Sequence, residues 1–122
     1  MRRPVVGICT HLEQVRWGVW DRRADVTGGD LVYAVQRAGA QALLIPADPA
    51  LVDDPGALLE RIDGLVVEAR EDADGDGWPE SLRARVEAAG VPVLRAVMAA
   101  GNGSTRAIAG ADLDEFVAKL RG

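Results

Sequence analysis

The stretch PVVGIC, residues 4–9, is a short apolar run rich in β-branched side chains. A run of this kind predicts a strand that is buried on both faces of a parallel sheet. Three more such runs lie at residues 42–45, 65–67 and 91–94. A weaker pattern at residues 105–109 predicts a fifth strand. Pro92 removes one backbone donor from the fourth of these strands.

Helical patterns separate the expected strands. The expected boundaries are an N-cap at Asp30 with an end at Gly39, a start at Asp53 or Asp54 with Pro55, a start at Pro79 with an end at Gly90, and an N-cap at Asp112. Residues 10–29 carry mixed charges and a glycine pair, and we expect them to form a long loop.

The alternation of strands and helices determines the expected fold class. Short connections between them imply βαβ units and a parallel sheet that is covered on both sides. We therefore expect residues 1–122 to form a single α/β domain. Its predicted architecture is a three-layer α/β/α fold of flavodoxin-like type with a mostly parallel sheet of about five strands.

The composition excludes several classes of protein. Of the 122 residues, 48% are apolar and 27% are charged, which is typical of a soluble globular domain. With one cysteine, Cys9, and one histidine, His11, the chain has neither an internal disulfide nor a Cys/His zinc site. The net charge of −5 offers no basic surface for nucleic acid or an anionic membrane. No apolar run is long enough to cross a bilayer, and we expect a cytoplasmic protein without a cofactor.

The order of motifs in the N-terminal half resembles a known family. The segments that carry the resemblance are GICT at 7–10, RWGVWD at 16–21, YAVQRAG at 33–39, LLIP at 43–46 and IDGLVV at 62–67. Together they resemble the gamma-glutamyl-gamma-aminobutyrate hydrolases of the class I glutamine amidotransferase-like superfamily, which are also classified as cysteine peptidases. The resemblance implies the fold of that superfamily.

The residues that would carry the chemistry of this family are replaced. The resemblance implies a Leu-Thr-Gly-Gly-type oxyanion turn after the third strand, but residues 67–70 read VEAR. It also implies a cysteine in a Gly-Ile-Cys-Arg-Gly-type elbow, where this chain has Val97. The His and Glu of the family triad have no counterpart before Gly122. Because Glu68 would repel the charge that an oxyanion hole stabilises, we expect a shortened relative without the ancestral Cys-His-Glu amide hydrolysis.

A relocated active site is the alternative. Cys9 and His11 lie where the first strand gives way to the expected loop, and residues two apart on a strand point the same way. A thiolate paired with an imidazole, oriented by Glu13 or Asp21, would form a nucleophilic site at the edge where Glu68 also lies. The competing interpretation is that Cys9 is a small buried apolar residue and that His11 is an ordinary loop residue.

Aromatic residues supply candidate ligand contacts at the same edge. Trp17, Trp20 and Trp78 fall in predicted loops or just before a helix, and together with Asp21 and Arg70 they could bind a flat ligand or a partner. The competing interpretation is that Trp17 and Trp20 fold back over the core.

The segment DADGDG, residues 72–77, matches the first half of a calcium loop. Asp72, Asp74 and Asp76 provide alternating carboxylates, and glycine follows at the sixth position. The twelfth position, where a bidentate glutamate belongs, is Arg83. The alternative is a solvated acidic turn.

Two functions from different classes follow from these patterns. The first is a non-catalytic domain that binds a small molecule or a protein and forms a homodimer, because an edge strand and exposed tryptophans favour self-association. The second is a small enzyme of specialised metabolism that acts on a metabolite through the relocated site.

Overall fold

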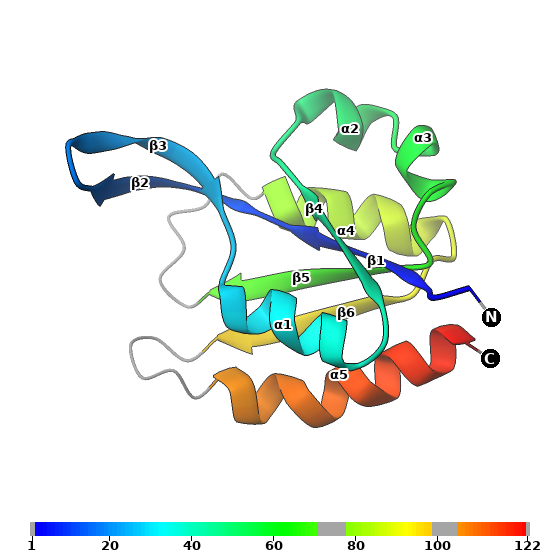
Figure 1. The fold of residues 1–122 in the computed structure, drawn as a ribbon. Coiled ribbons are helices and arrows are strands. Elements are labelled where there is room, and N and C mark those ends of the chain that lie inside the picture. The colour runs from blue at the N-terminus through cyan, green and yellow to red at the C-terminus, as the bar shows by residue number, and fades with distance from the viewer. Residues whose placement is uncertain (1, 71–77, 99–104, 122) are drawn as a thin grey trace.

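A four-stranded parallel sheet forms the centre of the molecule (Figure 1). The computed structural model describes residues 2–70, 78–98 and 105–121. The strands are β1 (Val5–Cys9), β4 (Gln41–Ile45), β5 (Gly64–Arg70) and β6 (Val93–Met98), in the spatial order β4-β1-β5-β6. The predicted apolar runs at residues 4–9, 42–45, 65–67 and 91–94 therefore fall in or overlap the strands of the sheet. Pro92 precedes β6, so it does not interrupt the strand, and its carbonyl accepts a 3.0 Å hydrogen bond from the Leu65 amide.

Helices cover both faces of the sheet, which confirms the predicted three-layer α/β fold. On one face α1 (Gly29–Arg37) and α5 (Thr105–Arg121) pack over a core of alternate strand residues such as Ile8 and Val66. On the other face α3 (Gly56–Leu59) and α4 (Trp78–Ala88) pack over the intervening residues, such as Cys9 and Val67, while α2 (Pro49–Asp53) borders this second core. The sheet is thus buried on both sides at β1 and β5, as the apolar runs predicted.

The prediction of a loop over residues 10–29 is wrong. This segment contains an antiparallel hairpin of β2 (His11–Trp17) and β3 (Trp20–Val26), which forms a second, two-stranded sheet. The two-residue turn begins at Gly18, which has a φ of 61°. A positive φ at the first turn position alone is the type II′ geometry that matches the twist of hairpin strands, and glycine adopts it without strain.

The prediction of a fifth strand at residues 105–109 is also wrong, because α5 begins at Thr105 and not at a cap on Asp112. Leu113 and Val117 are fully buried and anchor the helix on the sheet. Extending an existing helix by one residue costs far less free energy than starting a new helix. Residues 105–109, whose own preference is weak, therefore continue the helix that Leu113 and Val117 anchor.

Three smaller boundaries also differ from expectation. The N-cap of α1 is Gly28, so Asp30 lies in the first helical turn, where its negative charge interacts favourably with the positive end of the helix dipole. Helix α2 was not predicted, although Asp48 caps it by accepting from the Ala50 amide at 3.0 Å. Strand β4 was expected to be buried, but it is an edge strand whose Leu43 and Leu44 are exposed.

Two helix ends agree with the sequence. Gly39 and Gly90 follow α1 and α4 with φ values of 103° and 88°, the left-handed conformation that glycine favours after a helix. None of the helices within the described residues combines the length and apolar character that spanning a bilayer requires.

We expect the packing of α5 to contribute strongly to stability. Replacing the fully buried Leu113 with alanine should lower the free energy of unfolding by about 2–5 kcal/mol, because it opens a cavity between α5 and the sheet. The exposed Leu12 is the control, and Leu12→Ala should change the free energy of unfolding by less than about 0.5 kcal/mol. Urea unfolding monitored by circular dichroism measures both. Equal effects would show that α5 is not packed on the core.

Candidate functional site

The candidate site lies at the carboxyl ends of the parallel strands, where open α/β sheets bind ligands. Thr10, the residue between β1 and β2, is the centre of this region and is 3% exposed. Its hydroxyl donates to Asp25 Oδ1 at 3.1 Å, and its carbonyl accepts from Trp78 Nε1 at 3.0 Å. Asp25 also accepts from the Ala47 amide at 3.3 Å. Thr10 and Asp25 therefore fasten the base of the hairpin to the end of the sheet.

Cys9 is buried in the core between the sheet and α4, together with Trp78 and Leu82. Burial, together with a smaller effect of the negative charge of Glu80, raises the pKa of the Cys9 thiol from 9.0 to about 12. A buried thiol with a raised pKa is neutral at physiological pH, whereas the thiolate is the nucleophile. These features favour the interpretation of Cys9 as a small buried residue.

His11 and Glu13 belong to the hairpin and not to the sheet. His11 is the first residue of β2 and is paired with Val26, while Glu13 is paired with Ala24. The imidazole Nε2 of His11 is shielded from solvent, and none of the residues that the structure describes forms a hydrogen bond with it. The geometry thus places Cys9 in the sheet core and the other two candidates on a separate ribbon.

Glu68 is almost completely buried, at 5% exposure, within β5. The strand continues past this residue to Arg70, and Glu68, Ala69 and Arg70 pair with Ala96, Val97 and Met98 of β6. Regular parallel pairing therefore includes both the position of the expected oxyanion turn and the position of the expected nucleophile.

The three tryptophans do not form one ligand site. Trp17 and Trp20 are cross-strand partners beside the hairpin turn, 70% and 47% exposed, so the idea that they fold back over the core is wrong. Trp78 is 8% exposed in the core of the domain. Asp21 lies on the hairpin, where it pairs with Arg16 at 3.2 Å. Arg70 ends β5, and only its backbone is described.

The calcium prediction concerns residues that are not described. Asp72, Asp74 and Asp76 lie in the segment 71–77, outside the described part of the chain, so calcium binding there stays a prediction. Within residues 2–70, 78–98 and 105–121, no group of three or more His, Cys, Asp or Glu side chains is placed to hold a metal ion.

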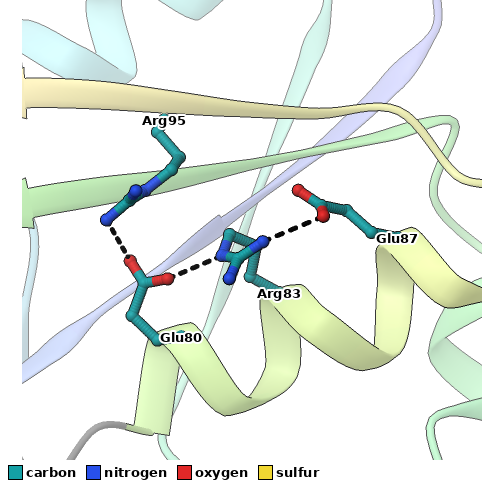
Figure 2. Close-up of polar contacts among 4 residues, drawn as sticks. All are labelled: Glu80, Arg83, Glu87 and Arg95. Atoms are coloured by element: carbon teal, nitrogen blue, oxygen red, sulfur yellow. Dashed lines mark hydrogen bonds and ion pairs between the residues drawn. The ribbon is translucent and has the colours of Figure 1, made fainter.

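An ion-pair network joins α4 to β6 beside this edge (Figure 2). Glu80 accepts from Arg83 Nε at 2.6 Å and from Arg95 at 2.9 Å, and Arg83 also pairs with Glu87 at 2.9 Å. The hydrogen bond from Arg83 lowers the pKa of Glu80, and the charge of Arg95 lowers it further. The network fixes the start of α4, which carries Trp78, against the sheet.

Sequence reasoning missed Thr10, Asp25 and this network. The i, i+3 and i, i+4 spacing of Glu80, Arg83 and Glu87 is a visible helix signal that could have identified part of it. The contacts of Asp25 and Arg95 depend on the tertiary fold, and no local sequence pattern predicts them.

Comparison with known proteins identifies the family. The model of the family described as Peptidase C26 matches residues 4–94, well over half of the chain. The chain belongs to the peptidase C26 family. It is also 39% identical over 72 residues to a Mycobacterium tuberculosis protein named "Putative glutamine amidotransferase". That match covers 59% of this chain and 23% of the relative, so the chain spans well under two thirds of the relative's length.

Membership of the peptidase C26 family supports the resemblance to the glutamine amidotransferase superfamily. The structure shows what replaces the two catalytic motifs that the resemblance implies. Where the resemblance implies a glycine turn and a nucleophile elbow, this family member has two paired strands, because residues 67–70 and 95–97 contain no glycine that would allow a sharp turn.

The buried thiol leads to a prediction on pH dependence. Because the pKa of Cys9 is raised in the folded state from an ordinary value of 9.0, its contribution to stability is constant below pH 9 and is lost as the pH rises toward 12. Wild-type protein should therefore lose stability above pH 9 more steeply than Cys9→Ala. Unfolding curves at a series of pH values test this, and parallel curves would contradict it. Iodoacetamide at neutral pH should label Cys9 only after unfolding.

The network of Glu80 leads to the opposite pH dependence. Since the pKa of Glu80 is lowered, its contribution is present above about pH 4.5 and is lost as the pH falls. The Glu80 carboxylate is partly exposed, so Glu80→Gln should lower the free energy of unfolding by less than about 1 kcal/mol at pH 7, and by less still in acid. Glu115→Gln, which removes a more exposed pair with Lys119, is the control and should cost less. A cost that grows in acid would refute this role.

Proposed function

We propose that this peptidase C26 domain is a non-catalytic glutamine amidotransferase-like module that binds a small molecule or a protein. The observation that carries the proposal is the pairing of β5 with β6 through Glu68–Ala96 and Ala69–Val97. An oxyanion hole needs amides aimed at one point, and a nucleophile elbow needs a sharp turn that exposes the side chain. Two regular strands at these positions supply neither feature.

The charge at this edge also opposes amide hydrolysis. Glu68 is buried where the resemblance places the oxyanion, and a carboxylate there destabilises a developing negative charge. Valine at position 97 has no nucleophilic atom. These residues support descent from an amide hydrolase of the gamma-glutamyl-gamma-aminobutyrate type whose chemistry has been lost.

The alternative function is an enzyme with a relocated site of Cys9, His11, Glu13 and Glu68. The burial and raised pKa of Cys9 weigh against it, as does the placement of His11 and Glu13 on the hairpin. We further propose that the module acts in the cytoplasm as a homodimer.

A hydrolysis assay tests the proposal. Pure protein incubated with glutamine or gamma-glutamyl-gamma-aminobutyrate should release no ammonia or gamma-aminobutyrate above the rate in buffer. The variants Cys9→Ser and Glu68→Gln should behave like the wild type. A turnover that these two variants abolish, and that the surface control Tyr33→Phe retains, would overturn the proposal and establish the relocated site.

A further inference from the structure

The hairpin of residues 11–26, here named the arm, is a separate ribbon that extends away from the central sheet (Figure 1). Neither of its strands pairs with the four-stranded sheet in the described part of the chain. A two-stranded hairpin alone is at best marginally stable in water and gains stability when another surface packs on it. The fold supports the base of the arm through Asp25, whereas residues 16–23 of its distal half are all exposed.

One face of the distal arm is aromatic. Trp17 and Trp20 are directly opposite each other, so their indoles lie on the same face, and Val19 in the turn is 95% exposed. The Arg22 guanidinium lies on this face, 4.4 Å from the ring centre of Trp20. The opposite face is polar, because Asp21 pairs there with Arg16 and accepts from Gln14 at 2.8 Å. The aromatic face is therefore the one suited to docking.

The shape and chemistry of this face favour a protein partner. Small molecules bind in concave sites that surround most of their surface, whereas the arm projects from the molecule. Tryptophan and arginine are the side chains enriched at the energetic centres of protein interfaces. An aromatic pair on a projection suits insertion against the surface of another protein.

Charge favours a second copy of this chain as that partner. Residues 16–23 contain three arginines and one aspartate, although the chain as a whole has a net charge of −5. The distal arm is thus basic and the remainder of the molecule is acidic. The arm of one copy and the body of another are therefore complementary in charge, which promotes their association.

The edge of β4 is the matching surface on the body. Outside the arm, the large apolar side chains that are exposed among the described residues are Tyr33, Leu43 and Leu44. Leu43 and Leu44 are consecutive on β4, an edge strand of the central sheet, so they flank this edge on its two opposite faces. The exposed aspartates 48, 53 and 54 follow β4 closely along the chain and add acidic groups to the segment that leaves this edge.

We propose that the arm of one copy docks through Trp17 and Trp20 against the β4 edge of a second copy, and that the contact is reciprocal. Reciprocity follows from area. Complete burial of a tryptophan removes about 150–250 Å² from water, and Trp17 and Trp20 are 70% and 47% exposed, so one pair adds less than this and falls short of the roughly 800 Å² per partner of a stable interface. Two such contacts, in which each copy supplies an arm and an edge, approach that area. The inference rests on the proposed role as a binding module and names its partner.

Sedimentation of the wild type and matched variants tests this contact. Wild-type protein should be a dimer, and Trp17→Ser/Trp20→Ser should raise the dissociation constant by about tenfold or more. Leu43→Ser/Leu44→Ser should weaken it similarly, whereas Tyr33→Ser, which removes an exposed aromatic residue from α1, should not change it. Circular dichroism verifies that each variant is folded.

Charge reversal provides a second variant that leaves the tryptophans in place. Arg22→Glu should also raise the dissociation constant, because Arg22 lies on the docking face, and added salt should weaken the wild-type dimer. A wild type that is monomeric at every concentration, or a dimer that the arm variants leave unchanged, overturns the inference. The hydrolysis assay is independent of this result. An inactive monomer would contradict the docking of the arm but not the proposed lack of catalysis. An active dimer would contradict the proposed lack of catalysis but not the docking of the arm.

Discussion

The fold depends on β1 lying in the interior of a parallel sheet with both of its faces buried. Because successive side chains of a strand point to opposite faces, Val6 and Ile8 enter the core under α1 and α5, while Cys9 enters the core under α4. The packing around the strand is close, since a Cβ on Gly7 would lie 2.6 Å from Ile45 Cδ1 and the end of that side chain would have to shift. Strands β4 and β5 pair with it on either side, and β2 follows it after the single residue Thr10.

The same constraint explains which parts of the fold the sequence reveals. Strands buried on both faces are continuous apolar runs, and the glycines that end α1 and α4 are local signals, so both could be predicted. The hairpin of residues 11–26 has charged residues on both strands and one turn glycine, and its alternation is weak. Residues 105–109 are compatible with a strand or a helix, and only the burial of Leu113 and Val117 beyond them decides the outcome.

The candidate site was less predictable than the fold because it depends on contacts between distant residues. The sequence indicates His11 and Glu68 as candidates for this edge but does not reveal the contacts of Thr10, and the direction of each side chain follows from the pairing register. The buried thiol of Cys9 is a consequence of its position in β1, and Trp78 is held by a carbonyl 68 residues away in the chain. The change from turn to strand at residues 67–70 follows from the absence of glycine, which the sequence does show.

The distribution of the three tryptophans gives the protein a built-in optical reporter. Trp78 is enclosed and its indole hydrogen is bound to a carbonyl, whereas Trp17 and Trp20 face water at the end of the arm. Indole emission shifts with the polarity around the ring, so in a copy whose arm is undocked the blue part of the spectrum belongs to the core and the red part to the arm. One emission spectrum therefore separates loosening of the domain from a change around its projecting ribbon, without any attached label.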